Sequence, residues 1–168
     1  MRRATAFTLV EILIVVVLLG VLAAVVVPSF SNASQSARCS MLLDNLRIMR
    51  TQVQVFKAQH NDVAPGYPGL DNTAAPTEEA FVDHMTMATT VSGDVAAPGT
   101  GGYPYGPYLR EIPENPVNGR ASVRVLADGD AFPAEAANTH GYVYQPATGI
   151  LKADSTGTDE GGRAFFDY

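Results

Sequence analysis

Residues 7–27 read FTLVEILIVVVLLGVLAAVVV, an apolar run whose one charged residue is Glu11. Sixteen of these residues are Phe, Leu, Ile or Val. As a helix the run is about 31 Å long, close to the thickness of the hydrocarbon core of a bilayer. Each large apolar residue contributes roughly −0.4 kcal/mol to insertion, whereas a charge at mid-membrane costs about 3 kcal/mol. The run is therefore predicted to form a membrane-spanning helix that tolerates Glu11.

The composition of the whole chain excludes several other classes of protein. The 168 residues include 11 Lys and Arg against 17 Asp and Glu, a net charge of −6. This balance argues against general binding to phosphate backbones, which needs clustered basic residues, so no nucleic-acid partner is expected. Because Cys39 is the only cysteine, no intramolecular disulfide can form. The length suits one small domain with an appendage.

Three interpretations of the apolar run are open. A removable secretory signal would have its basic region at Arg2 and Arg3, but the run exceeds the usual length and contains an acid. A plain single-span anchor is the second interpretation. The third depends on Glu11 and on residues 1–6, MRRATA, a short basic segment that meets the apolar run abruptly at Phe7.

This third pattern resembles the class III leader of type IV pilins and of type II secretion pseudopilins. In that family a membrane peptidase cuts before the Phe and methylates the new amino terminus. The resemblance implies cleavage between Ala6 and Phe7 and N-methylation of Phe7. Relatives usually carry Gly before the cut, and the alanine found here is still small, so processing is expected. The implied domains are a leader at 1–6, a transmembrane and filament-core helix at 7–28, and a periplasmic domain at 29–168.

Glu11 lies one helical turn after Phe7. A freed α-amine is mostly cationic at neutral pH and can pair with a carboxylate. The pair can form within one chain, or between Glu11 of one subunit and the amino terminus of its neighbour, where it would set the register of assembly. The resemblance favours the second arrangement. The alternative is that Glu11 merely lies among lipid headgroups.

Gly20 and Pro28 fall where chains of this family commonly carry a glycine and a proline. They weaken a helix locally by about 1 and 3 kcal/mol relative to Ala, so bending or partial melting on assembly is expected. Tolerated irregularities in a membrane span are the alternative. Charge alone hardly orients the helix, but the prepilin-type leader implies a cytoplasmic amino terminus and a periplasmic carboxyl-terminal domain, with the protein moving from the inner membrane into a pseudopilus.

The helix is predicted to continue past the membrane, from about Phe7 to His60. Its second half has an apolar stripe at spacings of four and three, predicted to face a domain core: Leu42, Leu46, Met49, Val53 and Phe56. Residues 78–89 have helical composition. Alternating residues predict strands at 122–126 and 141–144, and a turn at 146–149 predicts a hairpin over 141–151. The fold class is therefore α+β, with one long helix packed on a small antiparallel sheet.

The carboxyl-terminal half sharpens the resemblance. GPYLREIPENP at 106–116, GYVY at 141–144 and an Asp/Gly-rich end are similar to the major pseudopilins of type II secretion, although the tryptophan often found there is missing. The resemblance implies a pseudopilus subunit that polymerises through its apolar helix and drives export of folded proteins across the outer membrane. Its implied partners are copies of itself, the prepilin peptidase, minor pseudopilins, the inner-membrane platform and membrane lipid. A type IV pilin for adhesion, motility or DNA uptake and a membrane-anchored binding module are the alternatives.

Residues 151–162, LKADSTGTDEGG, bring several oxygen ligands close together in sequence. Calcium takes six to eight oxygens at about 2.4 Å. Major pseudopilins have a calcium-binding carboxyl-terminal loop. Carried over, that resemblance implies Asp154, Ser155 and Asp159 as side-chain ligands and Leu151 as a carbonyl ligand, with Ca2+ as the one candidate cofactor. An ordinary acidic surface turn is the alternative.

The sequence carries no catalytic signature. Its three histidines, His60, His84 and His140, lack the spacing of metal ligands. No phosphate-binding loop, dinucleotide fingerprint or nucleophile elbow occurs. A structural protein rather than an enzyme is expected.

Overall fold

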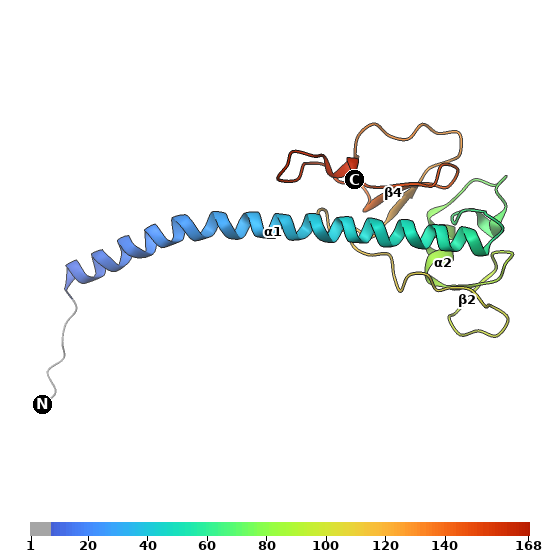
Figure 1. The fold of residues 1–168 in the computed structure, drawn as a ribbon, viewed down its shortest axis with the longest axis horizontal. Helices are drawn as coiled ribbons and strands as arrows, with labels where there is room; N and C mark the ends of the chain where they lie inside the picture. The colour runs from blue at the N-terminus through green and yellow to red at the C-terminus, as the bar shows by residue number, and fades with distance from the viewer. Residues whose placement is uncertain (1–7) are drawn as a thin grey trace, which may run out of the picture. The chain divides into compact units, whose positions relative to one another are not determined.

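The computed structural model describes residues 8–168, with side-chain surroundings given for residues 8–24 and 34–168. The chain divides into two compact units, Met1–Ala37 and Arg38–Tyr168. Helix α1 (Leu9–Gln59) is one continuous element of 51 residues (Figure 1). Its bounds lie close to those predicted from the sequence, and both Gly20 and Pro28 fall within it. Among the described residues, no helix is both long enough and apolar enough to span a membrane.

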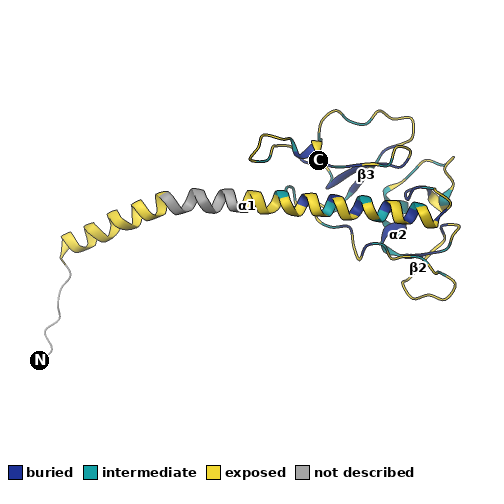
Figure 2. Cartoon of the chain, in the orientation of Figure 1, coloured by how far each residue is buried: buried dark blue, intermediate teal, exposed yellow. Residues whose placement is uncertain are grey.

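The predicted core stripe on α1 is confirmed. Each of its five side chains is at most 1 % exposed: Leu42, Leu46, Met49, Val53 and Phe56. Figure 2 shows buried and exposed residues alternating along this half of α1, as expected for a helix with one face against a core. In the first unit, every described side chain from Thr8 to Ala24 is exposed instead.

Helix α2 (Glu78–Thr86) is shorter than the predicted 78–89. It begins after Thr77, whose hydroxyl oxygen accepts the backbone N–H of Ala80 at 3.1 Å and so caps the helix. The residues that follow form β1 (Ala88–Thr89), which pairs antiparallel with β2 (Val95–Ala96). Strands of two residues are too short to show a period, which is why this hairpin was not predicted.

The main sheet has the order β3-β4-β5. Strand β4 (Tyr142–Gln145) and β5 (Ile150–Ala153) form the predicted antiparallel hairpin. Strand β3 (Val123–Val125) pairs parallel to β4, so the expectation of a wholly antiparallel sheet was wrong and the sheet is mixed. The long connection over residues 126–141 explains this, because it returns the chain to the end of the sheet from which β3 started.

One hydrophobic cluster joins α1, α2 and the sheet. Apart from Phe56, the α1 stripe packs with Phe81 of α2, with Tyr142 and Tyr144 of β4, and with Leu151 of β5. Two short 3-10 helices, η1 (Pro68–Leu70) and η2 (Phe165–Asp167), complete the elements. The predicted α+β class, with a long helix packed on a small sheet, is confirmed in this unit.

Candidate functional site

Thr8 and Glu11 form a capping box at the start of α1. The Glu11 Oε2 atom accepts from the Thr8 backbone N–H at 2.9 Å and from its hydroxyl at 2.8 Å. In return, Thr8 Oγ1 accepts the Glu11 N–H at 3.2 Å. Such reciprocal bonds satisfy backbone donors that the first turn leaves unpaired. The T-x-x-E pattern at 8–11 is visible in the sequence, but the two roles predicted for Glu11 were an ion pair with an amino terminus or a place among lipid headgroups, not this cap.

The predicted processing site precedes the part of the chain that the structure describes. Ala6 and Phe7 lie outside the described residues, so cleavage between them, methylation of Phe7 and its pairing with Glu11 stay predictions. At Gly20, an added Cβ would meet no atom within 4 Å, so packing within the described chain does not require a glycine there. The side chain of Pro28 is outside the described part, and a hinge at either residue stays a prediction.

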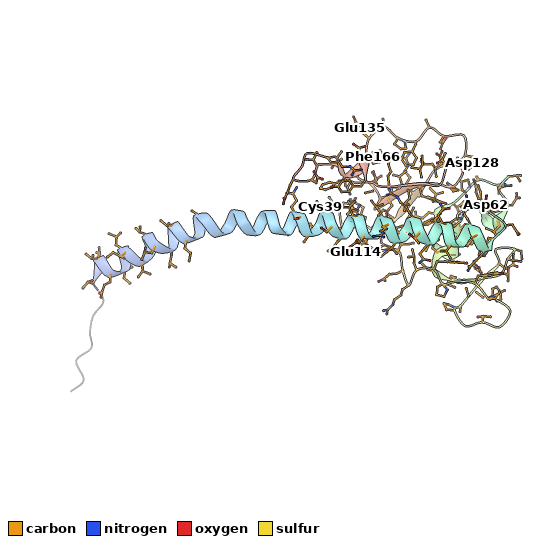
Figure 3. All side chains as sticks on the ribbon, viewed as in Figure 1. Cys39, Asp62, Glu114, Asp128, Glu135 and Phe166 are labelled. Atoms are coloured by element: carbon orange, nitrogen blue, oxygen red, sulfur yellow. The ribbon has the colours of Figure 1, made fainter. Side chains whose placement is uncertain are left out.

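The first unit presents an apolar surface on all sides. Its large apolar side chains between Leu9 and Leu22 are exposed by 48 % at Val15 to 83 % at Leu9. Figure 3 shows side chains projecting from both sides of this part of the ribbon. A helix that is apolar all round belongs in lipid or in a protein core, because water disfavours an uninterrupted apolar surface of this kind.

The predicted calcium ligand Leu151 already has a cationic partner. Its carbonyl oxygen accepts from Arg50 Nε at 3.0 Å and from Nη2 at 2.6 Å. The same Nη2 donates to the carbonyl oxygen of Tyr168 at 2.8 Å. Burial, with a smaller contribution from the positive charge of Arg163, lowers the pKa of Arg50 from its ordinary value. A guanidinium nevertheless stays charged throughout the physiological range.

Asp154 is fully buried, and its carboxylate faces the loop at residues 137–140. Its carboxylate accepts the backbone N–H groups of residues 137–140, in order, at 2.7, 3.0, 2.9 and 2.9 Å. Burial alone would raise the pKa of Asp154, but the hydrogen bonds from these four N–H groups outweigh it and hold the pKa below its ordinary value.

The remaining two predicted ligands are also engaged. Ser155 Oγ accepts from Asn115 Nδ2 at 2.8 Å. Asp159 Oδ1 accepts the Arg163 backbone N–H at 2.9 Å, and Oδ2 accepts the Tyr168 hydroxyl. The Tyr168 hydroxyl, followed by the Arg163 N–H, lowers the pKa of Asp159.

The four predicted ligands are therefore close in sequence, but their oxygens accept hydrogen bonds from different segments of the chain. Among residues 8–24 and 34–168, no group of three or more His, Cys, Asp or Glu side chains is placed to hold a metal ion. The arrangement of these four residues therefore does not fit a calcium site. Sequence reasoning missed Arg50 and Asn115; the one available signal for Arg50 was its position beside the core residue Met49.

Two histidines belong to the core rather than to a ligand set. The rings of His60 and His84 stack on Phe56 at centroid distances of 3.9 and 5.1 Å. His60 bonds the Phe56 carbonyl at 2.8 Å and the Thr89 hydroxyl at 3.0 Å. Burial lowers the pKa of His84 from 6.5 to about 4.

Comparison with known proteins gives two kinds of similarity. Residues 1–27 match the prokaryotic N-terminal methylation motif. The type II secretion system core protein G of Klebsiella pneumoniae is 32% identical over 116 residues, which cover 69% of this chain and 71% of the relative. The core protein G of Dickeya chrysanthemi is 30% identical over 115 residues, which cover 68% of this chain and 64% of that relative. Prepilin peptidase-dependent protein D of Escherichia coli strain K12 is 25% identical over 91 residues, covering 54% and 62%. No solved structure matches the chain significantly.

Proposed function

The chain belongs to the type II secretion system core protein G family, and from this premise we propose that it polymerises into a pseudopilus that drives export of folded proteins across the outer membrane. It is a homologue of major pseudopilins, and that family is structural rather than enzymatic. The observation that carries the proposal is the exposed apolar surface of Leu9–Leu22, which lies within the N-terminal methylation motif of residues 1–27.

We propose that other copies of this chain bury the apolar surface of Leu9–Leu22. Burial of apolar area contributes about 25 cal/mol per Å², so packing such helices side by side at the centre of a fibre is strongly favourable once they leave lipid. Before assembly, lipid of the inner membrane covers the same surface. The energy for movement comes from elsewhere in the machinery, because no nucleotide-binding motif occurs in the sequence.

A second apolar stripe supports contact between copies. Met41, Ile48 and Val55 lie on α1 at intervals of seven residues and are 58 %, 50 % and 38 % exposed. Their positions lie outside the core stripe, on another face of the helix. Apolar residues at a spacing of seven are typical of helix-to-helix seams. We assign this stripe, called the outer stripe below, to contacts with neighbouring subunits.

The proposal extends to processing and location, which the leader supports. The proposed domains are the leader 1–6, the transmembrane and filament-core helix 7–28, and the periplasmic domain 29–168. The prepilin peptidase would cut between Ala6 and Phe7 and methylate Phe7. The amino terminus would be cytoplasmic, and the minor pseudopilins and the inner-membrane platform would be the further partners. The basic leader and the methylation motif at residues 1–27 support this arrangement.

The test is deletion of the gene, combined with electron microscopy of the processed protein. We expect the deletion strain to retain folded exoproteins in the periplasm, and the purified protein to form fibres. Loss of surface fibres or twitching with normal secretion would instead indicate a type IV pilin. Failure to form filaments under any condition would favour a membrane-anchored binding module and contradict the proposal.

A further inference from the structure

We propose that the carboxyl-terminal segment of this chain is fastened by its own side chains instead of by a calcium ion, with Arg50 supplying the positive charge at the Leu151 carbonyl. The fastening group, called the clasp below, consists of Arg50, Asp159, Arg163 and Tyr168. The inference goes beyond the proposed function, since it concerns how one subunit holds its own end.

Arg50 acts where a metal ion would otherwise gather carbonyl oxygens. It reaches from α1 to Leu151 on β5 and to Tyr168 after η2, residues that are 101 and 118 positions away in sequence. Two of its nitrogens share the Leu151 oxygen, at 3.0 and 2.6 Å. A divalent cation on that oxygen would lie beside the guanidinium, and like charges at such a distance repel.

The rest of the clasp closes the loop between residues 159 and 168. The Tyr168 hydroxyl donates to Asp159, and the Arg163 guanidinium carbon lies 4.6 Å from the centre of the Tyr168 ring. The Arg163 backbone N–H donates to the other Asp159 oxygen at 2.9 Å, and its side chain donates to the Asp167 carbonyl. Both carboxylate oxygens of Asp159 are therefore used within the loop.

Asp154 anchors the start of the same segment. Its buried carboxylate receives hydrogen bonds from four successive backbone N–H groups, at residues 137–140. A carboxylate offers about four lone-pair sites, so this set leaves none for a metal ion. Binding calcium through Asp154 would require these bonds to break.

The experiment uses the full-length protein in detergent, with thermal unfolding followed by circular dichroism in EGTA and in millimolar CaCl2. The wild-type Tm should differ by less than about 1 °C between the two buffers, whereas a bound ion near saturation would raise it by about 5 °C or more. Arg50→Met should lower Tm by about 5 °C in both buffers. The matched control is Arg47→Met, an exposed arginine one turn earlier on α1, and it should leave Tm unchanged.

A second measurement covers the case in which Arg50→Met fails to fold. Trypsin cleavage after Arg163, followed by mass spectrometry, reports opening of the clasp directly. Arg50→Lys keeps the charge but loses the planar fork, so it should speed this cleavage by about fivefold or more without change in overall fold. Calcium should not slow the cleavage. A calcium-dependent rise in wild-type Tm, calcium protection of this cleavage, or equal behaviour of the Arg50 and Arg47 variants would overturn the proposal.

Discussion

Glu11 has two roles, one in capping α1 and one proposed in assembly, and the free energies associated with them differ. As part of the capping box with Thr8 it stabilises the start of α1, and losing a cap costs about 1 kcal/mol. As the partner of a neighbour's amino terminus in an apolar fibre it would matter more, since breaking a buried pair costs about 3–5 kcal/mol. The proposed role in assembly should therefore dominate the phenotype.

Two substitutions separate these roles. Thr8→Ala removes the hydroxyl cap and keeps the carboxylate, whereas Glu11→Ala removes both contributions. We expect Thr8→Ala to retain most of the filament yield and Glu11→Ala to lose nearly all of it, with membrane insertion unchanged in both. Counting filaments by electron microscopy checks this. Equal loss in the two variants would leave capping as the whole explanation.

Tyr144 offers a test of a buried hydroxyl. Its side chain is fully buried, and its oxygen has no hydrogen-bond partner among the described residues. An unsatisfied buried polar group costs about 1–3 kcal/mol, so Tyr144→Phe should leave Tm unchanged or raise it by a few degrees. Chemical denaturation provides an independent measure. A clear loss of stability would mean that the hydroxyl has a partner after all.

At the scale of elements, helix α1 has two apolar faces with different structural roles. The core stripe packs inside one subunit, and the outer stripe is assigned to neighbouring subunits. The core stripe could be predicted from the sequence, because residues at intervals of three and four lie along one side of a helix. The outer stripe was not predicted, because Met41, Ile48 and Val55 become significant only when the structure shows that they are uncovered.

A matched pair of substitutions distinguishes the two faces. Leu46 is fully buried and Ile48, two residues later, is 50 % exposed. Leu46→Ala should cost about 2–5 kcal/mol of unfolding free energy, because it leaves a cavity in the core. Ile48→Ala should change stability by less than about 0.5 kcal/mol and yet reduce filament yield. Normal filaments from the Ile48 variant would remove the outer stripe from the interface.

At the scale of the whole molecule, the folded unit should become less stable in mild acid. Burial lowers the pKa of His84 to about 4 from its ordinary value of 6.5. Between pH 6.5 and 4, His84 is therefore protonated in the unfolded chain but stays neutral in the folded chain. Stability contributed by neutral His84 is therefore complete above pH 6.5 and falls as the pH drops toward 4, by at most about 3 kcal/mol.

Thermal unfolding between pH 7.5 and 4.5 measures this effect. The wild-type Tm should fall over the window, and His84→Gln, which cannot charge, should show a flatter profile. His140 is only partly buried, so a His140→Gln variant serves as the matched control and should keep the wild-type slope. A His84→Gln profile as steep as that of wild type would assign the acid sensitivity to other groups.

Local sequence patterns were enough to predict the long helix, its core stripe, the 141–151 hairpin and the prepilin-type amino terminus. Each depends on residues that are neighbours along the chain, where a period of 3.6 or 2 or a short motif is enough. Tertiary structure alone decided the parallel pairing of β3 with β4, the partners of Asp154 and the reach of Arg50 to Leu151. These depend on which distant segments meet in space, and hydrogen-bonding groups pair with whatever donor or acceptor the fold brings within about 3 Å.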